Sequence, residues 1–124
     1  AGVMEYNGDV YSCDHFVYPE YRLGNINEHT ITQMMYSQQQ KDFSRMKRQL
    51  LPKQCEECKF AFACHGECPK NRFIKDKYGN PGLNYLCEGY YMFFEHAAPY
   101  MDFMKKELEA KRSPANVMKM ILEK

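Results

Sequence analysis

Six unevenly spaced cysteines constrain this 124-residue chain more than any other feature. The segment 54–73 reads QCEECKFAFACHGECPKNRF and holds four of them, whereas the other two stand alone far upstream and downstream. This segment has little apolar periodicity and contains Gly66 and Pro69, so it cannot build a core of its own. Its structure must therefore depend on what the thiols bind. The six are Cys13, Cys55, Cys58, Cys64, Cys68 and Cys87.

Disulfide bonds are the weakest explanation for these thiols. Six cysteines in 124 residues fall below the roughly 8–10% that marks small disulfide-stabilised scaffolds. The pair Cys55-x2-Cys58 instead allows two thiolates to face one point from a tight turn, as in metal-binding knuckles. The spacing thus favours metal ligation.

Zinc and iron–sulfur clusters both suit thiolate ligands, and the residues alone leave both open. A tetrahedral zinc site could use the first three clustered cysteines with Cys68 or Cys87. His65 could substitute for one of these ligands, but we interpret it as a surface loop residue. Four clustered cysteines plus two isolated ones favour two interleaved sites. A close-packed run whose fourth cysteine serves another cluster occurs in two-cluster ferredoxins.

The N-terminal half is predicted to be a β-hairpin followed by short helices. Alternating residues around Asn7-Gly8 predict a hairpin over 3–14, with strands at 3–6 and 9–12 and a two-residue type I′ turn. Pro19 and Gly24 predict a loop over 15–26. Helices are predicted over 30–50, in two pieces at 31–36 and 38–48 that Thr30 and Ser37 cap.

The C-terminal half is predicted to be a cysteine-rich loop over 54–84 followed by helices over 85–123. Aromatic and methionine residues recur at helical spacing from Leu86 to Leu108, which favours a core-facing stripe. Pro99 is expected to kink or restart that helix. The fold class is thus a small, irregular α+β domain spanning 1–124, with an N-terminal β-hairpin, a cysteine-rich metal-binding loop region and C-terminal helices.

Composition excludes two classes of partner. The formal net charge is +1, which gives no support for nucleic-acid binding. The basic residues at 41–48 and 70–72 could face a partner or the rest of a longer chain, but we interpret them as solvated. No apolar run approaches the roughly 20 residues that span a bilayer, so we expect a cytoplasmic protein without membrane contact. The chain enters its hairpin almost at once and lacks an initiator methionine, so we expect a piece of a longer chain.

The cysteines and one glycine together resemble the SPASM domain of radical S-adenosylmethionine enzymes. That family has a cysteine, a G-x4-C element, a C-x2-C-x5-C-x3-C run and a final cysteine. Everything except the first cysteine is present, beginning with Gly8-x4-Cys13. The stretches GDVYSCDHFVYP, CHGECPKNRF and NYLCEGYYMFFEHAAPYM are similar to those of anaerobic sulfatase-maturating enzymes, and the resemblance covers about residues 5–110.

The resemblance implies two auxiliary [4Fe–4S] clusters. The proximal cluster is expected to use Cys13, Cys68 and two cysteines from a preceding segment, so its ligand set is incomplete here. A radical-forming N-terminal domain with its S-adenosylmethionine site is likewise expected to lie outside these residues. Zinc is expected to replace the distal cluster when the chain is purified in air. The ligands of the distal cluster would be Cys55, Cys58, Cys64 and Cys87.

The implied activity belongs to the parent enzyme, which would oxidise a sulfatase serine or cysteine to formylglycine. Asp14 would be the general base of that reaction, and the isolated chain would not be catalytic. The implied partners are a sulfatase or other peptide and the chain's own radical domain. Two alternatives remain: a SPASM domain that serves a different peptide-modifying enzyme, and a small structural zinc-binding interaction module.

Overall fold

The computed structural model describes residues 2–122 and divides the chain into two compact units, Ala1–Tyr85 and Leu86–Lys124. Each unit is described by itself below. The predicted α+β class, with an N-terminal hairpin and C-terminal helices, is confirmed. The expected domain ends at 1 and 124, and the expected helix end at 123, lie outside the described residues.

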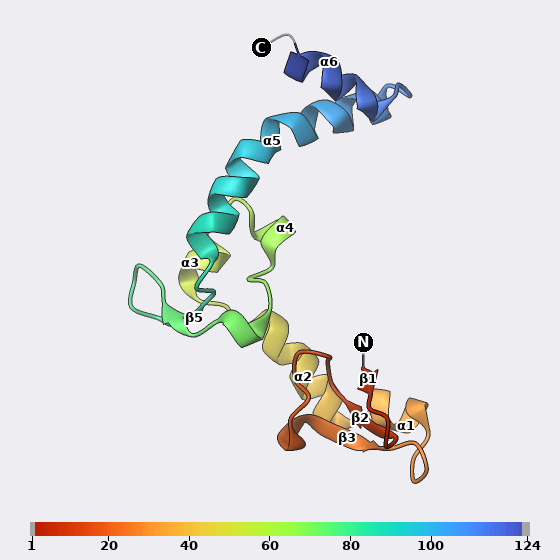
Figure 1. Ribbon diagram of the computed structural model, residues 1–124. Helices are drawn as coiled ribbons and strands as arrows, with labels where there is room; N and C mark the ends of the chain where they lie inside the picture. The colour runs from red at the N-terminus through yellow and green to blue at the C-terminus, as the bar shows by residue number, and fades with distance from the viewer. Residues whose placement is uncertain (1, 123–124) are drawn as a thin grey trace. The chain divides into compact units, whose positions relative to one another are not determined.

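A three-stranded antiparallel sheet begins the first unit (Figure 1). Its strands are β1 (Val3–Met4), β2 (Asp9–Tyr11) and β3 (Arg22–Asn25). The prediction of a loop over 15–26 was wrong at β3, which follows a 3-10 turn, η1 (Pro19–Tyr21). Gly24 lies opposite Val10, and the register of the β2–β3 pair shifts between Val10 and Tyr11.

The β1–β2 turn differs from the predicted type I′ turn. Gly8 alone adopts a positive φ, of 87°, and Asn7 does not. The Gly8 N–H donates to Glu5 O at 3.0 Å, which makes the turn longer than two residues. The Asn7 side chain instead accepts a hydrogen bond from the Asp9 N–H at 3.0 Å, so it stabilises the turn without left-handed backbone.

Two helices follow at the positions predicted from their caps. The Thr30 side chain accepts from Gln33 N–H before α1 (Ile31–Met35), and Ser37 caps α2 (Gln38–Gln49). Phe43 of α2 packs edge-on against the rings of Phe16 and Tyr21, with centroids 5.2 and 5.7 Å away. Val10, Phe16, Met34 and Phe43 are all buried and form the core beside the sheet.

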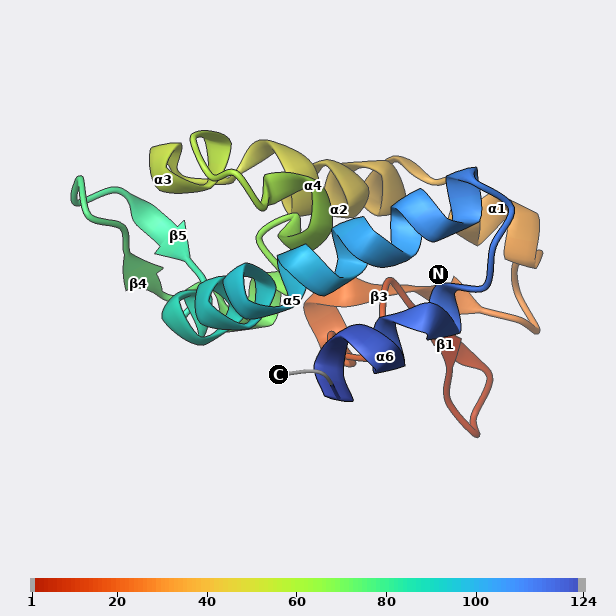
Figure 2. The same cartoon turned by 90° about the horizontal axis from the view of Figure 1, so that it is seen from above.

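The cysteine-rich segment is more regular than predicted. It forms two one-turn helices, a 3-10 turn and a β-hairpin within the expected loop 54–84. In Figures 1 and 2 this hairpin and the β1–β2 hairpin lie at opposite ends of the first unit. The elements are α3 (Lys53–Glu56), α4 (Ala61–Cys64), η2 (Pro69–Asn71), β4 (Ile74–Lys75) and β5 (Pro81–Leu83).

The second unit is one long helix with a folded-back end. Helix α5 (Cys87–Glu109) runs through Pro99 without interruption, and Figure 1 shows it bending along its length. η3 (Pro114–Asn116) and α6 (Val117–Leu122) return alongside its C-terminal part (Figure 2). Within residues 2–122, no helix combines the length and apolarity needed to cross a membrane.

The predicted core-facing stripe on α5 is largely exposed. Phe93 is 62% exposed, Met101 57% and Leu108 60%. Only η3 and α6 fold onto α5 among the described elements of its own unit, and they cover its last turns. Helical spacing thus predicted the helix correctly but did not predict which side chains the unit buries.

Candidate metal centre

All six cysteines are partly exposed, and none of them forms a disulfide bond. Thiol side chains of intermediate burial are the donor type that zinc and iron–sulfur clusters use.

Local backbone geometry brings the first three clustered cysteines into one segment. Pro52 begins α3, and its carbonyl accepts the Cys55 N–H at 2.8 Å. The Cys58 N–H then donates to Cys55 O at 3.3 Å, which closes the tight turn expected of a C-x2-C pair. Cys64 ends α4, where its N–H donates to Phe60 O at 2.9 Å.

The short link between Cys64 and Cys68 has an unusual backbone. His65, Gly66 and Glu67 all have positive φ, at 50°, 71° and 53°. Arg72 binds the carbonyls of these three consecutive residues: its Nε donates to Gly66 O at 2.8 Å, and its Nη2 donates to the oxygens of His65 and Glu67. One side chain thus holds the whole link.

Arg72 also lies within electrostatic range of the cysteines. Its partial burial lowers the pKa of the Arg72 guanidinium below its ordinary value, while negative charge on Cys55, Cys68 and Cys64 acts in the opposite direction. Three of the four clustered cysteines therefore act electrostatically on one partly buried cation. An arginine keeps its proton in proteins, so this cation is permanent.

A buried carboxylate fixes the start of α3. Asp76 is 6% exposed and accepts hydrogen bonds from the N–H groups of Gln54, Tyr78 and Asn80 at 3.2, 2.9 and 2.8 Å. Burial acts to raise the pKa of Asp76, but these hydrogen bonds outweigh it and lower the pKa below 3.8. In addition, the side-chain oxygen of Gln54 accepts a hydrogen bond from the Lys77 N–H at 2.9 Å. The β4–β5 hairpin is thereby tied to the residue before Cys55.

A second group of side chains joins the N-terminal sheet to the cysteine-rich segment. His15 Nδ1 lies 3.2 Å from Cys68 Sγ, although the two are 53 residues apart. Cys13 Sγ donates to Asp14 Oδ1 at 3.2 Å, and Lys47 Nζ lies 4.0 Å from the same sulfur. The structure thus brings Cys68 to the segment 13–15, as the pairing of Cys13 with Cys68 in one site requires.

The thiol of Cys13 influences the exposed Asp14 carboxylate. Its hydrogen bond is the main cause that lowers the pKa of Asp14 below 3.8, and the charge of His15 acts in the same direction. A metal-bound cysteine is deprotonated and cannot donate this bond. Metal binding at Cys13 would therefore free Oδ1 for another proton donor.

The chemistry of the side chains near Arg72 bears on which metal group fits. Cys55, Cys64 and Cys68 act electrostatically on Arg72, and their thiolates are the donor type of iron–sulfur clusters. Among residues 2–122, no group of three or more His, Cys, Asp or Glu side chains is arranged to hold a metal ion. Cys87 is the first residue of α5, in the second unit, so the fourth distal ligand stays a prediction.

Two residues near the cysteines were missed in the sequence. Arg72 was interpreted as solvated, which is wrong, because the side chain is partly buried against three carbonyls. Nothing in the sequence singled out His15, since its contact with Cys68 spans 53 residues. The only available signal was proximity in sequence: each lies within four residues of a cysteine.

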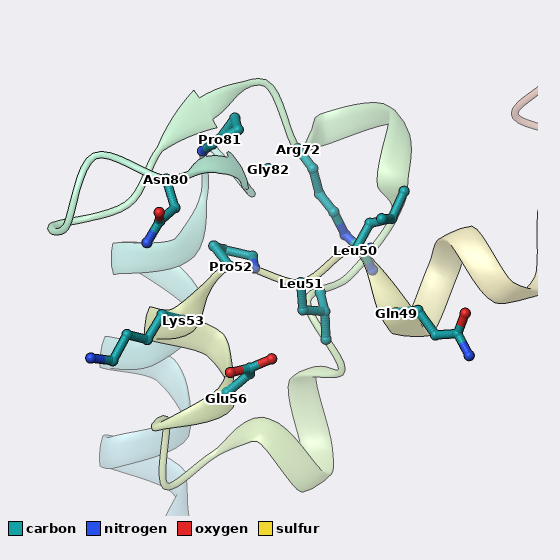
Figure 3. A pocket seen from close by; sticks show the side chains of 10 residues that line it. All are labelled: Gln49, Leu50, Leu51, Pro52, Lys53, Glu56, Arg72, Asn80, Pro81 and Gly82. Atoms are coloured by element: carbon teal, nitrogen blue, oxygen red, sulfur yellow. The ribbon is translucent and has the colours of Figure 1, made fainter.

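An open pocket of about 850 Å³ borders the same segment. Figure 3 shows Arg72 reaching toward the Leu50–Leu51 segment, opposite Pro81 and Gly82 of β5. The pocket thus shares Arg72 with the cysteine-rich segment, but it contains none of the six cysteines.

Comparisons with known proteins find one family model and several similar proteins. Residues 3–59 match the family model of SPASM, an iron–sulfur cluster-binding domain. The chain is 66% identical over 119 residues to the serine-type anaerobic sulfatase-maturating enzyme of Bacteroides thetaiotaomicron. This alignment covers 96% of the chain and 29% of that protein. It is 34% identical over 97 residues to the cysteine-type enzyme of Clostridium perfringens, in an alignment that covers 78% of the chain and 26% of that protein.

A solved structure of native anSMEcpe with bound AdoMet is similar as well. It matches with a TM-score of 0.67 and 34% identity, over 79% of this chain and 26% of that one. The chain therefore spans less than a third of the length of each protein it resembles. Residues 3–59 are thus similar to an iron–sulfur cluster-binding domain of the SPASM type, and over most of its length the chain is similar to part of the anaerobic sulfatase-maturating enzymes.

Proposed function

We propose that this chain binds auxiliary [4Fe–4S] clusters within a radical S-adenosylmethionine enzyme that oxidises a sulfatase serine to formylglycine. The observation that carries the proposal is the contact of Cys68 with the segment 13–15. This contact favours pairing Cys68 with Cys13 over a single site made of the four clustered cysteines. The identity of 66% to a serine-type maturating enzyme supports the choice of serine. A cytoplasmic location stays a prediction.

The ligands divide into two sets. The proximal set includes Cys13 and Cys68, and the other four cysteines form the distal set. When bound, such a cluster supplies one-electron transfer. The residues of the chain orient the thiolates, through the C-x2-C turn, the Asp76 bonds and the carbonyl contacts of Arg72. The distal set is Cys55, Cys58, Cys64 and Cys87.

Asp14 is proposed to take the hydroxyl proton of the substrate serine. Its carboxylate is exposed, and one of its oxygens faces the Cys13 sulfur at 3.2 Å. Ligation of Cys13 removes the thiol proton that occupies this oxygen, which leaves the carboxylate available as an acceptor. Proton removal would then occur beside a ligand of the proximal cluster.

Anaerobic reconstitution tests the cluster assignment. The chain should take up about four iron atoms and develop broad visible absorption, because the distal set alone is complete within these residues. Cys64→Ser should abolish the uptake. Cys13→Ser is the matched control and should retain it. Equal iron content in the two variants would contradict the division into two sets, and a colourless chain that holds zinc would favour the structural zinc module.

The substrate is tested in the full-length protein with a sulfatase peptide. Mass spectrometry should find that the target serine loses the equivalent of one hydrogen molecule, as conversion to formylglycine requires. Asp14→Asn should reduce the rate while leaving iron content unchanged. If the sulfatase peptide is unmodified but another peptide reacts, the alternative of a different peptide-modifying enzyme would stand.

A further inference from the structure

The backbone conformation of the link between Cys64 and Cys68 is energetically unfavourable unless other groups stabilise it. Left-handed backbone costs a non-glycine residue roughly 1–2 kcal/mol, and two of the three linking residues, His65 and Glu67, are not glycine. Three consecutive left-handed residues persist only where surrounding contacts impose them. The carbonyls of this link face Arg72, which is therefore the group that imposes the conformation.

The guanidinium suits this task for two reasons. Its planar fork carries several N–H donors in fixed geometry, so one side chain can bind three carbonyls that a flexible ammonium would not hold together. It also brings a permanent positive charge to the three-residue link that joins Cys64 to Cys68. Backbone geometry and charge are thus controlled by one residue.

We infer that Arg72 is a positioning residue that fixes the Cys64–Cys68 link in the left-handed conformation presenting both thiolates to iron, and whose charge stabilises the reduced cluster. The inference rests on the proposed function, because it takes Cys64 to be a cluster ligand. Outer-shell partners of metal ligands typically change metal affinity by about 10- to 100-fold when mutated.

Two substitutions separate the two roles. Arg72→Gln removes both the charge and the fork, whereas Arg72→Lys keeps the charge and loses the fork. The control is Lys75→Gln, which removes an exposed cation from β4, three residues away. Each variant of the chain is reconstituted with iron and sulfide without oxygen. Two quantities are then measured: the rate at which an iron chelator extracts the metal, and the midpoint reduction potential.

The expected pattern distinguishes positioning from general stability. Both Arg72 variants should lose iron about 10- to 100-fold faster than wild type. Only Arg72→Gln should have a more negative potential, because a nearby cation favours the more negative reduced state. Lys75→Gln should match wild type in both. If Arg72→Gln does not fold, the extraction rate of Arg72→Lys decides.

The contrary results are equally distinct. Wild-type extraction rates in both Arg72 variants would overturn the positioning role while leaving the proposed function intact. An unchanged potential in cluster-loaded Arg72→Gln would overturn the role of the charge. Failure of the wild-type chain to take up iron would overturn the proposed function, and this inference with it.

Discussion

At the scale of the residue, two glycines form a natural comparison. Gly66 and Gly79 both have left-handed backbone, with φ of 71° and 84°. A Cβ on Gly79 meets nothing within 4 Å, whereas one on Gly66 would collide with Leu51 Cδ2 and lie 3.2 Å from Arg72 Nη2. Both positions thus require left-handed backbone, but only Gly79 has room for a side chain.

We predict that Gly79→Ala lowers the free energy of unfolding of the chain by about 1–2 kcal/mol, the cost of left-handed backbone for alanine. Gly66→Ala should cost about 1–3 kcal/mol more, because the added methyl overpacks the site. Urea unfolding measures both values. Equal losses would mean that Leu51 and Arg72 move aside freely.

The Asp76 carboxylate has a second testable role at this scale. Asp76→Ala should leave the N–H groups of Gln54, Tyr78 and Asn80 without their acceptor. These three amides should then exchange with deuterium much faster, which hydrogen-exchange NMR can follow individually. Asp42→Ala, which removes a 60%-exposed carboxylate paired with Arg45, is the control and should leave them unchanged.

At the scale of the element, α1 attaches to the sheet mainly through one side chain. Met34 is 2% exposed, whereas Ile31 of the same helix is 53% exposed. Met34→Ala should cost about 2–5 kcal/mol, the usual range for truncating a buried methionine. Ile31→Ala should change stability by less than about 0.5 kcal/mol. Thermal or urea unfolding of the two variants would refute this if their costs were similar.

The end of α5 depends on an ion pair that should respond to pH. Hydrogen bonds from Arg112 and Asn116 lower the pKa of Glu107 from 4.5 to about 2. Because the folded pKa is depressed, the stabilisation is complete above pH 4.5 and is lost as the pH falls towards 2. Amide exchange in η3 and α6 should therefore rise across that interval.

Glu107→Gln is the matched variant for this measurement. It should expose η3 and α6 to exchange already at neutral pH and abolish the further rise in acid, because glutamine does not titrate in this range. Persistence of the acid-induced rise in Glu107→Gln would assign it to other carboxylates.

The elements also explain what the sequence could predict. Helices α1 and α2 were predicted correctly because Thr30 and Ser37 are signals within the helices' own first turns. β3 was missed because its strand character comes from pairing with β2, and Gly24 argued against it. The cysteines stand out in the sequence by their spacing, and their role as ligands stays a prediction. Arg72 does not stand out, since only the folded link reveals what its guanidinium binds.

At the scale of the whole molecule, the two units differ in how much they bury. The first unit has a core that includes Val10, Met34 and Phe43. Among residues 86–122, only Val117 and Glu107 are buried. Protein segments of fewer than about 40 residues rarely fold without a metal, a disulfide or a partner.

We therefore predict unequal protection in the metal-free chain. Amides of β1–β3 should exchange slowly, at rates set by unfolding of the first unit, whereas amides of α5 should exchange orders of magnitude faster. Hydrogen exchange with mass spectrometry on the same sample compares the two directly. Protection of α5 equal to that of the sheet would show that the second unit has stability of its own.

One turn of α2 connects the apolar core to Cys13. Phe43 packs in the core against Phe16, and the ammonium of Lys47 lies 5.1 Å from the Phe43 ring and 4.0 Å from the Cys13 sulfur. The Phe16 N–H also donates to Cys13 O at 3.0 Å. Substitutions that repack this core to raise the melting temperature would thus also shift Lys47 relative to the Cys13 sulfur. The stability of this core and the electrostatic environment of Cys13 are therefore coupled through Phe43 and Lys47.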